Sequence, residues 1–372
     1  MYDFLVVGAG LAGCTMAERL AGELGATVLV VDKRPNVAGN AYDPVDASGL
    51  RRHAYGPHVF HANSPVVVAY LSRFTAWRPY EHRVLAHVGH QLLPLPINRT
   101  TINRLFGLHL SEAGVAKFLA SRAEKSRPVH DSERAILSSV GRELYELFFR
   151  GYTRKQWGLE PSELDASVCG RIPVRTGDDD RYFSDSFQAM PRDGFEAMCL
   201  RMLAQPGIET ALGTSFEESA SRVRFDRIVY TGPIDEFFEY RYGKLPYRSL
   251  RFEFETMPFE RYQSAAVINE PSESVPFTRT TEHKYLTGQT HPHTVVSREY
   301  PSAEGDPYYP IPRPENRAQY AKYAKLAATE RNVTFVGRLA EYRYYNMDQV
   351  VASALRTFED IAKDWTSFER IA

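Results

Sequence analysis

The sequence has little of what marks secreted, membrane-spanning or nucleic-acid-binding chains. Its 372 residues include three cysteines, Cys14, Cys169 and Cys199, which lie far apart and form neither a CxxC pair nor a zinc-ligand spacing. A disulfide framework is therefore excluded, and a reducing cytoplasm is the expected location. No apolar run approaches the roughly 20 residues of a membrane helix, and we expect no signal peptide before the first strand. The formal net charge of −1 gives no reason to expect nucleic acid or membrane as a partner.

What remains is the composition of an ordinary globular protein, with 43% hydrophobic and 24% charged residues. A chain of this length is too long for one simple core, so we expect two or three structural units.

The first 32 residues have the pattern of a dinucleotide-binding unit. A buried strand at Tyr2 to Val7 runs into the glycine turn Gly8 to Gly13, a helix follows up to Leu24, and a second buried strand ends at Asp32. In this pattern the first glycine makes the tight turn, the second admits the pyrophosphate, and the third lets helix and strand pack closely. The helix N-terminus then offers free N–H groups to phosphate, and Asp32 is expected to bind ribose hydroxyls.

Two further features favour FAD over NAD. A second glycine turn with basic residues, Lys33 to Ala41, follows directly after the acid. Near the other end, Gly337 and Arg338 end a strand, and a helix is predicted to begin near Asn346, where its positive end would stabilise a reduced, anionic flavin.

The middle of the chain changes character. Apolar residues at helical spacing predict one helix around Val115 to Leu119 and another around Ile136 to Phe148, followed by a polar loop at 161–181. Strand patterns then return at Leu250 to Glu255, with period two. Further strands are predicted at Ala265 to Ile268, Thr278 to Leu286, Thr294 to Glu299 and Asn332 to Gly337.

The predicted fold class is α/β: a discontinuous FAD-binding Rossmann-like domain with an inserted helical-bundle domain and an antiparallel β-sheet domain. We assign residues 1–78, 187–240 and 312–372 to the FAD-binding domain. Residues 97–170 form the helical domain, with a mobile substrate loop at about 161–181. Residues 79–96, 182–186 and 241–311 form the sheet domain.

Several short motifs, in order along almost the whole chain, resemble the bacterial UDP-galactopyranose mutase family. The most specific is GYTRKQWG at 151–158. Others are GNAY at 39–42, YGPHVFH at 55–61, LPIN at 95–98, RIPVR at 171–175, EHK at 282–284, PYYP at 307–310 and YRY at 342–344.

The resemblance implies a flavin-dependent isomerase that interconverts UDP-galactopyranose and UDP-galactofuranose, with N5 of reduced FAD as the nucleophile at the anomeric carbon and no net redox change. It also implies NAD(P)H or another reductant to keep FAD reduced, and a homo-oligomer, a dimer or larger. The cofactor contacts we expect are Gly8, Gly10, Leu11, Ala12, Gly13, Asp32, Lys33, Arg34, Gly39, Asn40, His58, Val59, Val223, Gly337, Arg338, Met347, Asp348 and Gln349.

Residues matched to the family's substrate site have side chains that suit a nucleoside diphosphate. Arg171 and Arg279 match the family's two diphosphate-binding arginines. Arginine suits this role because a planar guanidinium group can bridge phosphate oxygens. With His58, whose backbone carbonyl is expected beside flavin N5, they form the predicted catalytic set. The predicted substrate contacts are Phe148, Phe149, Tyr152, Thr153, Trp157, Tyr182, Asn269, Tyr309, Tyr344, Asn346 and His82.

Some of these assignments have competing interpretations. Phe148 also fits a helix core, Arg175 lies close to Arg171, and Tyr308 adjoins Tyr309. Asn346 stands where many bacterial members have an aspartate; it cannot act as a general base, but it is a good helix N-cap.

Two rival functions share parts of this pattern. A flavin amine oxidase would have the FAD motifs but an apolar substrate cavity, and a binding protein on the same scaffold would lack flavin. A metal centre is not expected, since His291 and His293 have no third ligand in sequence.

Overall fold

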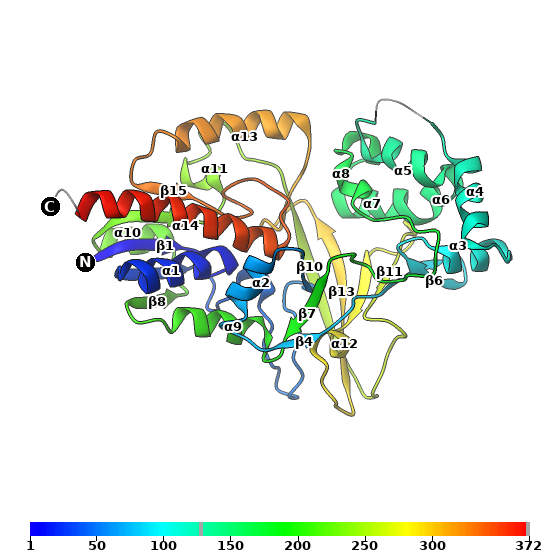
Figure 1. The fold of residues 1–372 in the computed structure, drawn as a ribbon, viewed down its shortest axis with the longest axis horizontal. Helices are drawn as coiled ribbons and strands as arrows, with labels where there is room; N and C mark the ends of the chain where they lie inside the picture. Colours follow the sequence, from blue (N-terminus) through cyan, green and yellow to red (C-terminus); the bar gives the residue numbers. More distant parts are fainter. Residues whose placement is uncertain (126–128, 370–372) are drawn as a thin grey trace.

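The computed structural model describes residues 1–125 and 129–369. An α/β unit at one end and a helical unit at the other flank a tall sheet that is antiparallel except for the parallel pair β11 and β5 (Figure 1). The predicted fold class is confirmed. The α/β unit is assembled from three separate stretches of chain, because β1 pairs with β9, and β9 pairs with β15.

A five-stranded parallel sheet forms the centre of the α/β unit, in the order β15-β9-β1-β2-β8. The strands are β1 Tyr2–Val7, β2 Val28–Asp32, β8 Ile208–Leu212, β9 Phe225–Tyr230 and β15 Val333–Phe335. The helices of this unit are α1 Leu11–Leu24, α2 Pro65–Leu71, α9 Gly194–Leu203, α10 Phe216–Arg222, α11 Ile234–Phe237, α13 Pro314–Ala327 and α14 Met347–Glu369.

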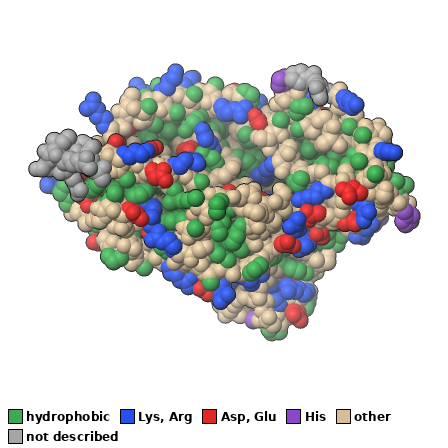
Figure 2. Space-filling view, viewed as in Figure 1, with side chains coloured by type: hydrophobic (Ala, Val, Ile, Leu, Met, Phe, Trp, Pro, Cys, Tyr) green, Lys and Arg blue, Asp and Glu red, His purple; other side chains and the backbone are tan. Residues whose placement is uncertain are grey.

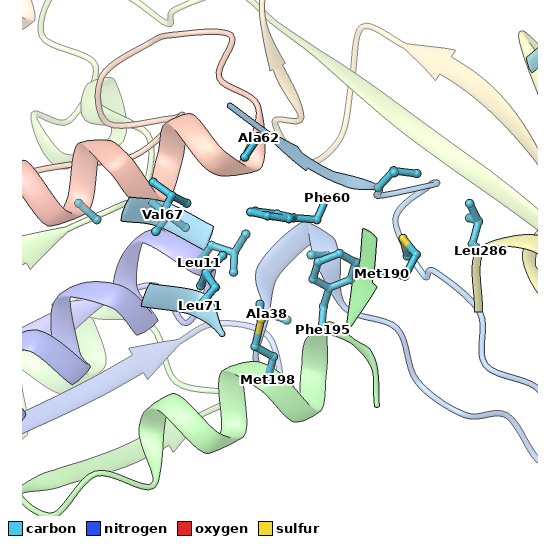
Figure 3. Packing of buried hydrophobic residues seen from close by; sticks show 14 of the residues in the cluster. Leu11, Ala38, Phe60, Ala62, Val67, Leu71, Met190, Phe195, Met198 and Leu286 are labelled. Carbon is cyan, nitrogen blue, oxygen red and sulfur yellow. The ribbon is translucent and has the colours of Figure 1, made fainter. Parts of the chain in front are cut away.

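Alternate residues of β1 serve two different cores. Phe4 and Val6 belong to the large core that also includes residues of α1 and α14, whereas Leu5 belongs to a smaller core packed by Phe216 of α10. Both faces of the sheet are therefore covered, as expected for parallel strands. Figure 3 shows how Phe60, Phe195 and Met198 fill the large core beside the start of α1.

A seven-stranded sheet has the strand order β14-β10-β13-β12-β11-β5-β6. The strands are β5 Val84–Val88, β6 Gln91–Leu95, β10 Tyr247–Met257, β11 Val267–Asn269, β12 Arg279–Glu282, β13 Thr294–Ser302 and β14 Tyr309–Pro310. A small sheet of β3 Phe60–Ala62, β7 Phe187–Pro191 and β4 Trp77–Pro79 joins this sheet to the α/β unit.

The prediction of one strand from Thr278 to Leu286 was wrong in its second half. The strand ends at Glu282, and α12 (His283–Thr287) follows, closed by the left-handed Gly288. The buried Lys284 donates to the carbonyls of Glu260 and His293, so tertiary hydrogen bonds favour a turn over further strand.

The helical unit comprises α3 Arg99–Phe106, α4 Glu112–Arg122, α5 Ser132–Val140, α6 Arg142–Tyr145, the π-helical turn η2 Glu146–Arg150, α7 Gly151–Trp157 and α8 Ser167–Gly170. The single helix predicted around Ile136 to Phe148 was wrong. Gly141 interrupts it with φ +79°, and a Cβ there would lie 2.3 Å from the carbonyl oxygen of Arg122. The chain turns at Gly141 because α4 passes too close for any side chain.

The segment predicted as a polar loop at 161–181 contains two short helices, η3 Pro161–Glu163 and α8. Its acidic run is paired with arginines: Asp178 with Arg99, Asp180 with Arg83, and Asp179 with Arg181. None of the helices in the described parts of the chain is both long and apolar enough to cross a membrane.

Candidate active site: a dinucleotide cavity beside an arginine cleft

The glycine turn after β1 is too tight for side chains at two positions. A Cβ on Gly13 would lie 1.8 Å from the carbonyl oxygen of Gly8, and one on Gly8, at φ +105°, would lie 2.0 Å from Thr231 Oγ1. At Gly39 a Cβ would lie 3.0 Å from Gly10 Cα. The two glycine turns thus pack against each other through backbone alone, and Gly8, Gly10 and Gly39 line the same cavity, where a pyrophosphate can approach the backbone closely.

Asp32 holds the two turns in place. Its carboxylate accepts hydrogen bonds from the backbone N–H groups of Ala9 and Arg34, each at 2.8 Å. The guanidinium group of Arg34 donates to Asn40 and Asp306 and lies 4.1 Å from the centre of the Tyr55 ring. Each carboxylate oxygen of Asp32 keeps a second lone pair for a ribose hydroxyl.

A cavity opens at this edge of the parallel sheet. Thirteen of the predicted cofactor residues line it: Gly8, Gly10, Leu11, Ala12, Asp32, Lys33, Arg34, Gly39, Asn40, His58, Gly337, Arg338 and Met347. Five do not: Gly13, Val59, Val223, Asp348 and Gln349. Gly13 acts through packing, and Val223 packs instead in the small core with Leu5, Leu29 and Val31.

Sequence reasoning missed part of the cavity wall. It also includes Thr214, Ser215, Phe216, Tyr230, Thr231, Gly232 and Asp306 to Tyr308. Thr214 follows β8 and Thr231 follows β9, and both strands lie beside the N-terminal βαβ unit. Their position directly after strands could have identified them, since ligands bind at the carboxyl ends of parallel strands. That inference needs the order of the strands in the sheet, which the sequence does not give.

Three histidines in a line support the turn at His58: His53 and His283 are buried, and His58 is partly buried. The backbone N–H of His53 donates to His283 Nδ1, and the backbone N–H of His58 donates to His53 Nδ1, both at 3.1 Å. The His58 ring must donate from Nδ1 to the Gly56 carbonyl at 2.9 Å, which leaves Nε2 as an acceptor. Burial, aided by Arg338 and Arg279, lowers the pKa of His58 to about 4, so the ring is neutral near pH 7.

The seven-stranded sheet presents a row of polar side chains beside this cavity. Asn269 of β11 lies directly opposite Arg279 of β12, and Arg279 lies opposite Glu299 of β13. Arg279 Nη2 donates to Glu299 at 3.0 Å, while its buried Nε has no hydrogen-bond partner within the described residues. A partly buried guanidinium whose Nε donor is buried and unpaired is suited to an anionic ligand.

Arg171 approaches the same place from the helical unit. It directly follows α8, and its guanidinium carbon lies 4.5 Å from the centre of the Tyr344 ring. Tyr344 in turn packs edge-on against Tyr309 at 5.4 Å and Trp157 at 5.7 Å. Tyr182 and Tyr309 lie within electrostatic reach of both Arg171 and Arg279, so the two arginines share tyrosine neighbours. We call this cluster of arginines and tyrosines the cleft. Figure 2 shows the surface hollowed between the α/β and helical units.

The structure separates the residues whose assignment was ambiguous in sequence. Tyr309 lies with Trp157 and Tyr344, whereas Tyr308 lines the dinucleotide cavity. Arg175 does not share the cleft contacts of Arg171: it donates to backbone carbonyls of its own loop, at Asp179 and Arg181.

The aromatic residues of the GYTRKQWG region are divided between core and cleft. Phe148 and Phe149 are buried at 3% and 4% exposure and belong to the main core. Tyr152 lies near Arg279, and burial raises the pKa of its hydroxyl. Thr153 is buried against Cys169, with Oγ1 and Sγ 3.5 Å apart.

His82 is buried between tyrosines. It packs against Tyr182, and its Nδ1 is 3.0 Å from the Tyr80 hydroxyl. Burial, together with the charge of Arg279, lowers the pKa of His82 to about 3, which makes it a neutral hydrogen-bonding group rather than a cation.

Asn346 is the exposed residue immediately before α14. Its backbone N–H donates to the side chain of Gln349 at 2.9 Å, as in a capping box. Asp348, the second residue of the helix, has a buried Oδ1 with no hydrogen-bond partner in the described chain, and burial raises its pKa.

No three His, Cys, Asp or Glu side chains of residues 1–125 and 129–369 are arranged to hold a metal ion. His291 and His293 face each other at 5.6 Å, and the N–H of His293 donates to His291 Nδ1.

Comparison with known proteins gives one family. A family model described as UDP-galactopyranose mutase matches residues 147–344, and one described as an NAD(P)-binding Rossmann-like domain matches residues 6–74. A probable UDP-galactopyranose mutase of Klebsiella pneumoniae is 41% identical, covering 96% of this chain and 94% of the relative. A dTDP-fucopyranose mutase of Escherichia coli is 37% identical, covering 95% and 97%.

Solved structures agree on the fold. The crystal structure of a reduced UDP-galactopyranose mutase superposes with a TM-score of 0.78 at 15% identity, covering 98% of this chain and 94% of that one. A putative protoporphyrinogen oxidase from Exiguobacterium superposes with a TM-score of 0.71 at 13% identity, covering 97% and 98%.

Proposed function

This chain belongs to the UDP-galactopyranose mutase family, and we propose that it interconverts UDP-galactopyranose and UDP-galactofuranose with reduced FAD and no net redox change. The observation that carries the proposal is the convergence of Arg171 and Arg279 around Tyr309. This cleft adjoins the dinucleotide cavity, since Arg338 lines the cavity and its guanidinium carbon lies 5.7 Å from the centre of the Tyr309 ring.

The cavity residues fit FAD. The paired glycine turns leave room for a pyrophosphate, Asp32 retains lone pairs for a ribose, and His58, Arg338 and Met347 line the wall on the cleft side. Bound FAD supplies, in its reduced form, an N5 nucleophile for the anomeric carbon of the sugar.

Side chains of the protein stabilise the negative charge of the nucleotide diphosphate. A ring contraction at the anomeric carbon requires the bond to UDP to break, and negative charge then accumulates on the diphosphate. Arg171 and Arg279 place permanent positive charge where that happens. A tyrosine hydroxyl is an uncharged donor, so Tyr182, Tyr309 and Tyr344 donate hydrogen bonds to the phosphate oxygens without adding charge.

The remaining residues orient the substrate. Tyr152, with Phe148 and Phe149 behind it, offers a flat apolar wall for uracil. Thr153 and Asn269 contribute polar contacts to the nucleoside, and Trp157 and His82 close the cleft around the sugar. His58 contributes its backbone carbonyl beside flavin N5, while its ring, neutral near pH 7, donates to the Gly56 carbonyl and supports that turn.

The decisive experiment supplies dithionite-reduced protein with UDP-galactofuranose and follows UDP-galactopyranose by anion-exchange chromatography. Conversion by the reduced protein and none by the oxidised protein is expected. Production of hydrogen peroxide from amines, with no sugar conversion, would instead indicate an oxidase. A purified chain that carried no flavin would exclude both.

The relative from Escherichia coli named dTDP-fucopyranose mutase makes dTDP-fucopyranose a second candidate substrate. That sugar nucleotide has the same diphosphate but differs in the base methyl, the ribose 2′-hydroxyl and the sugar 6-hydroxyl. Parallel measurement of kcat/KM for both nucleotide sugars decides between them, with the higher value expected for the UDP sugar.

We further propose that NAD(P)H or another cellular reductant keeps the flavin reduced, and that the chain works in the cytoplasm as a homo-oligomer. Anaerobic bleaching of the flavin absorbance by NADPH tests the first statement, and light scattering after gel filtration tests the assembly.

A further inference from the structure

Lys155 has an environment that no catalytic step explains. It lies on α7, two residues after Thr153, and its ammonium group donates to four backbone carbonyls of one loop. The acceptors and their distances from Nζ are Glu270 at 2.6 Å, Ser272 at 2.7 Å, and Val275 and Phe277 at 2.9 Å each.

The loop that surrounds Lys155 joins two strands of the candidate substrate site. Asn269 is the last residue of β11, immediately before the loop, and Arg279 is the first residue of β12, two residues after Phe277. Because the cage includes the carbonyls of both Glu270 and Phe277, Lys155 holds the loop at both of its ends.

Helix α7 and the loop are also in close backbone contact. A Cβ on Gly151 would lie 2.4 Å from the carbonyl oxygen of Pro271. Tyr152, the next residue, lies within electrostatic reach of Arg279. A shift of the loop relative to α7 would therefore change how Arg279 and Tyr152 meet the same ligand.

From these contacts we propose that Lys155 is a positioning residue for the nucleotide: its ammonium fills a carbonyl cage in the 270–277 loop and thereby fixes Asn269 and Arg279 relative to Tyr152. The role rests on the proposed binding of a nucleotide diphosphate at this row. An ammonium has three N–H donors for four acceptors, so the cage is built around a compact positive charge and not around one directed hydrogen bond.

The charged groups around the cage are few. Glu270 and Glu273 of the loop lie within electrostatic reach of Lys155, Arg154 on α7 pairs with Glu273 at 2.9 Å, and His87 of β5 pairs with Glu270. Burial among carbonyls lowers the pKa of Lys155 to about 8, so the charge in the cage declines above that pH.

The test compares Lys155→Met with Arg154→Met in UDP binding by titration calorimetry and in turnover. Arg154 is the matched control, because it contacts the same loop from the same helix through exposed ion pairs, which contribute little. Lys155→Met is expected to raise the Kd of UDP and the KM of the UDP sugar by about tenfold with a smaller change in kcat, and Arg154→Met is expected to leave both near wild type.

Chemical rescue distinguishes a filled cage from general damage. Backbone carbonyls are the ligands of K⁺ in channel filters, so K⁺ or NH₄⁺ should restore part of the UDP affinity of Lys155→Met, and tetramethylammonium should not. Equal UDP affinity of wild type and Lys155→Met, or a weakened variant that neither ion improves, would overturn the inference. A wild-type chain that bound no UDP would overturn the proposed function as well.

If Lys155→Met does not fold, pH profiles decide. UDP affinity of the wild type should fall above about pH 8 relative to Lys155→Arg, whose guanidinium does not titrate in that range. The two proteins share every other titrating group, the ligand included. Parallel profiles from pH 7 to 9.5 would overturn the inference.

Discussion

Arg279 and Glu299 lie opposite each other on β12 and β13, with Nη2 and Oε1 3.0 Å apart. The Glu299 carboxylate orients the Arg279 guanidinium through Nη2. It does not bind every donor, because Nε has no hydrogen-bond partner in the described chain. The pair therefore presents a positioned cation with spare donors toward the cleft. It is the geometry expected of a diphosphate ligand.

Arg279→Ala should abolish sugar interconversion, by about 10²–10³-fold or more, while FAD stays bound. The reason is that this arginine belongs to the cleft and not to the dinucleotide cavity wall. Flavin absorbance per chain and chromatographic turnover measure the two effects separately. Arg251→Ala, an exposed arginine of β10, is the control. Turnover by Arg279→Ala within threefold of wild type would remove Arg279 from the site.

Tyr309→Phe and Tyr308→Phe should have different effects. Tyr309 lies beside Arg279 and Arg338, so loss of its hydroxyl should weaken UDP binding by about tenfold or more, the usual cost of a hydrogen bond to a charged group. Tyr308 lines the dinucleotide cavity, so its variant should change FAD retention and leave the Kd of UDP unaltered. The opposite pattern would show that Tyr308 is the phosphate ligand.

Much of this arrangement is local enough to be predicted. The strand, glycine turn and helix from Tyr2 to Leu24 are adjacent in sequence, and Gly8 and Gly13 each have a steric reason to be glycine. The alternation in β10 likewise predicts its wet and buried faces. Such elements need no knowledge of distant neighbours.

The parts that could not be predicted depend on contacts between distant segments. Gly141 breaks a helix because the Arg122 carbonyl lies against it, and no periodicity within the helix shows that. Thr231 reaches the cavity because β9 pairs with β1, more than 200 residues away in sequence. The cage around Lys155 consists of backbone carbonyls, which every residue type has, so the sequence does not indicate which ones surround the lysine.

Gly13→Ala should yield a folded protein that has lost its yellow colour. The new methyl would collide with the Gly8 carbonyl at 1.8 Å and open the turn that borders the pyrophosphate. Gly22→Ala on the same helix is the matched control, since its nearest neighbours would lie at an ordinary 3.5 Å and alanine favours helix. Flavin content and circular dichroism together measure the outcome. Full flavin content in Gly13→Ala would refute the proposed role of this turn.

The buried histidines predict steep loss of stability in mild acid. Burial lowers the pKa of His58 to about 4, of His82 and His283 to about 3, and of His53 well below its ordinary value. Between pH 6.5 and 4 the unfolded chain binds protons on these rings and the folded chain does not. Stability is therefore present above pH 6.5 and falls with decreasing pH, by about 1.4 kcal/mol per pH unit for each ring.

Asp43 has the opposite effect on the pH dependence of stability over much of this pH range. Burial raises its pKa to about 6, so the folded chain holds one proton that the unfolded chain has released above pH 4. Between pH 5 and 6, the slope of the free energy of unfolding against pH should correspond to a net uptake of about three protons on unfolding. Urea unfolding at several pH values measures it, and Asp43→Asn should steepen the slope by about one proton. His90→Gln, at the exposed turn between β5 and β6, should not change it. A stability curve that is flat from pH 7 to 5 would contradict the neutral histidines.

Asn346→Asp should leave turnover within about threefold of wild type. The substitution restores the carboxylate that many bacterial family members carry, but the residue lies at the N-terminus of α14, where Asp and Asn cap equally well. The Gln349 side chain would still accept from the backbone N–H of this residue. In the proposed mechanism the nucleophile comes from the cofactor and Arg171 and Arg279 bind the leaving charge, so a carboxylate here would have no proton to move. Asn346→Leu, with no polar group, separates capping from chemistry: it should lower the thermal midpoint and leave kcat of the folded protein similar. A tenfold rise in kcat for Asn346→Asp, strongest above the pKa of a free carboxyl, would instead show that the wild-type chain lacks a general base.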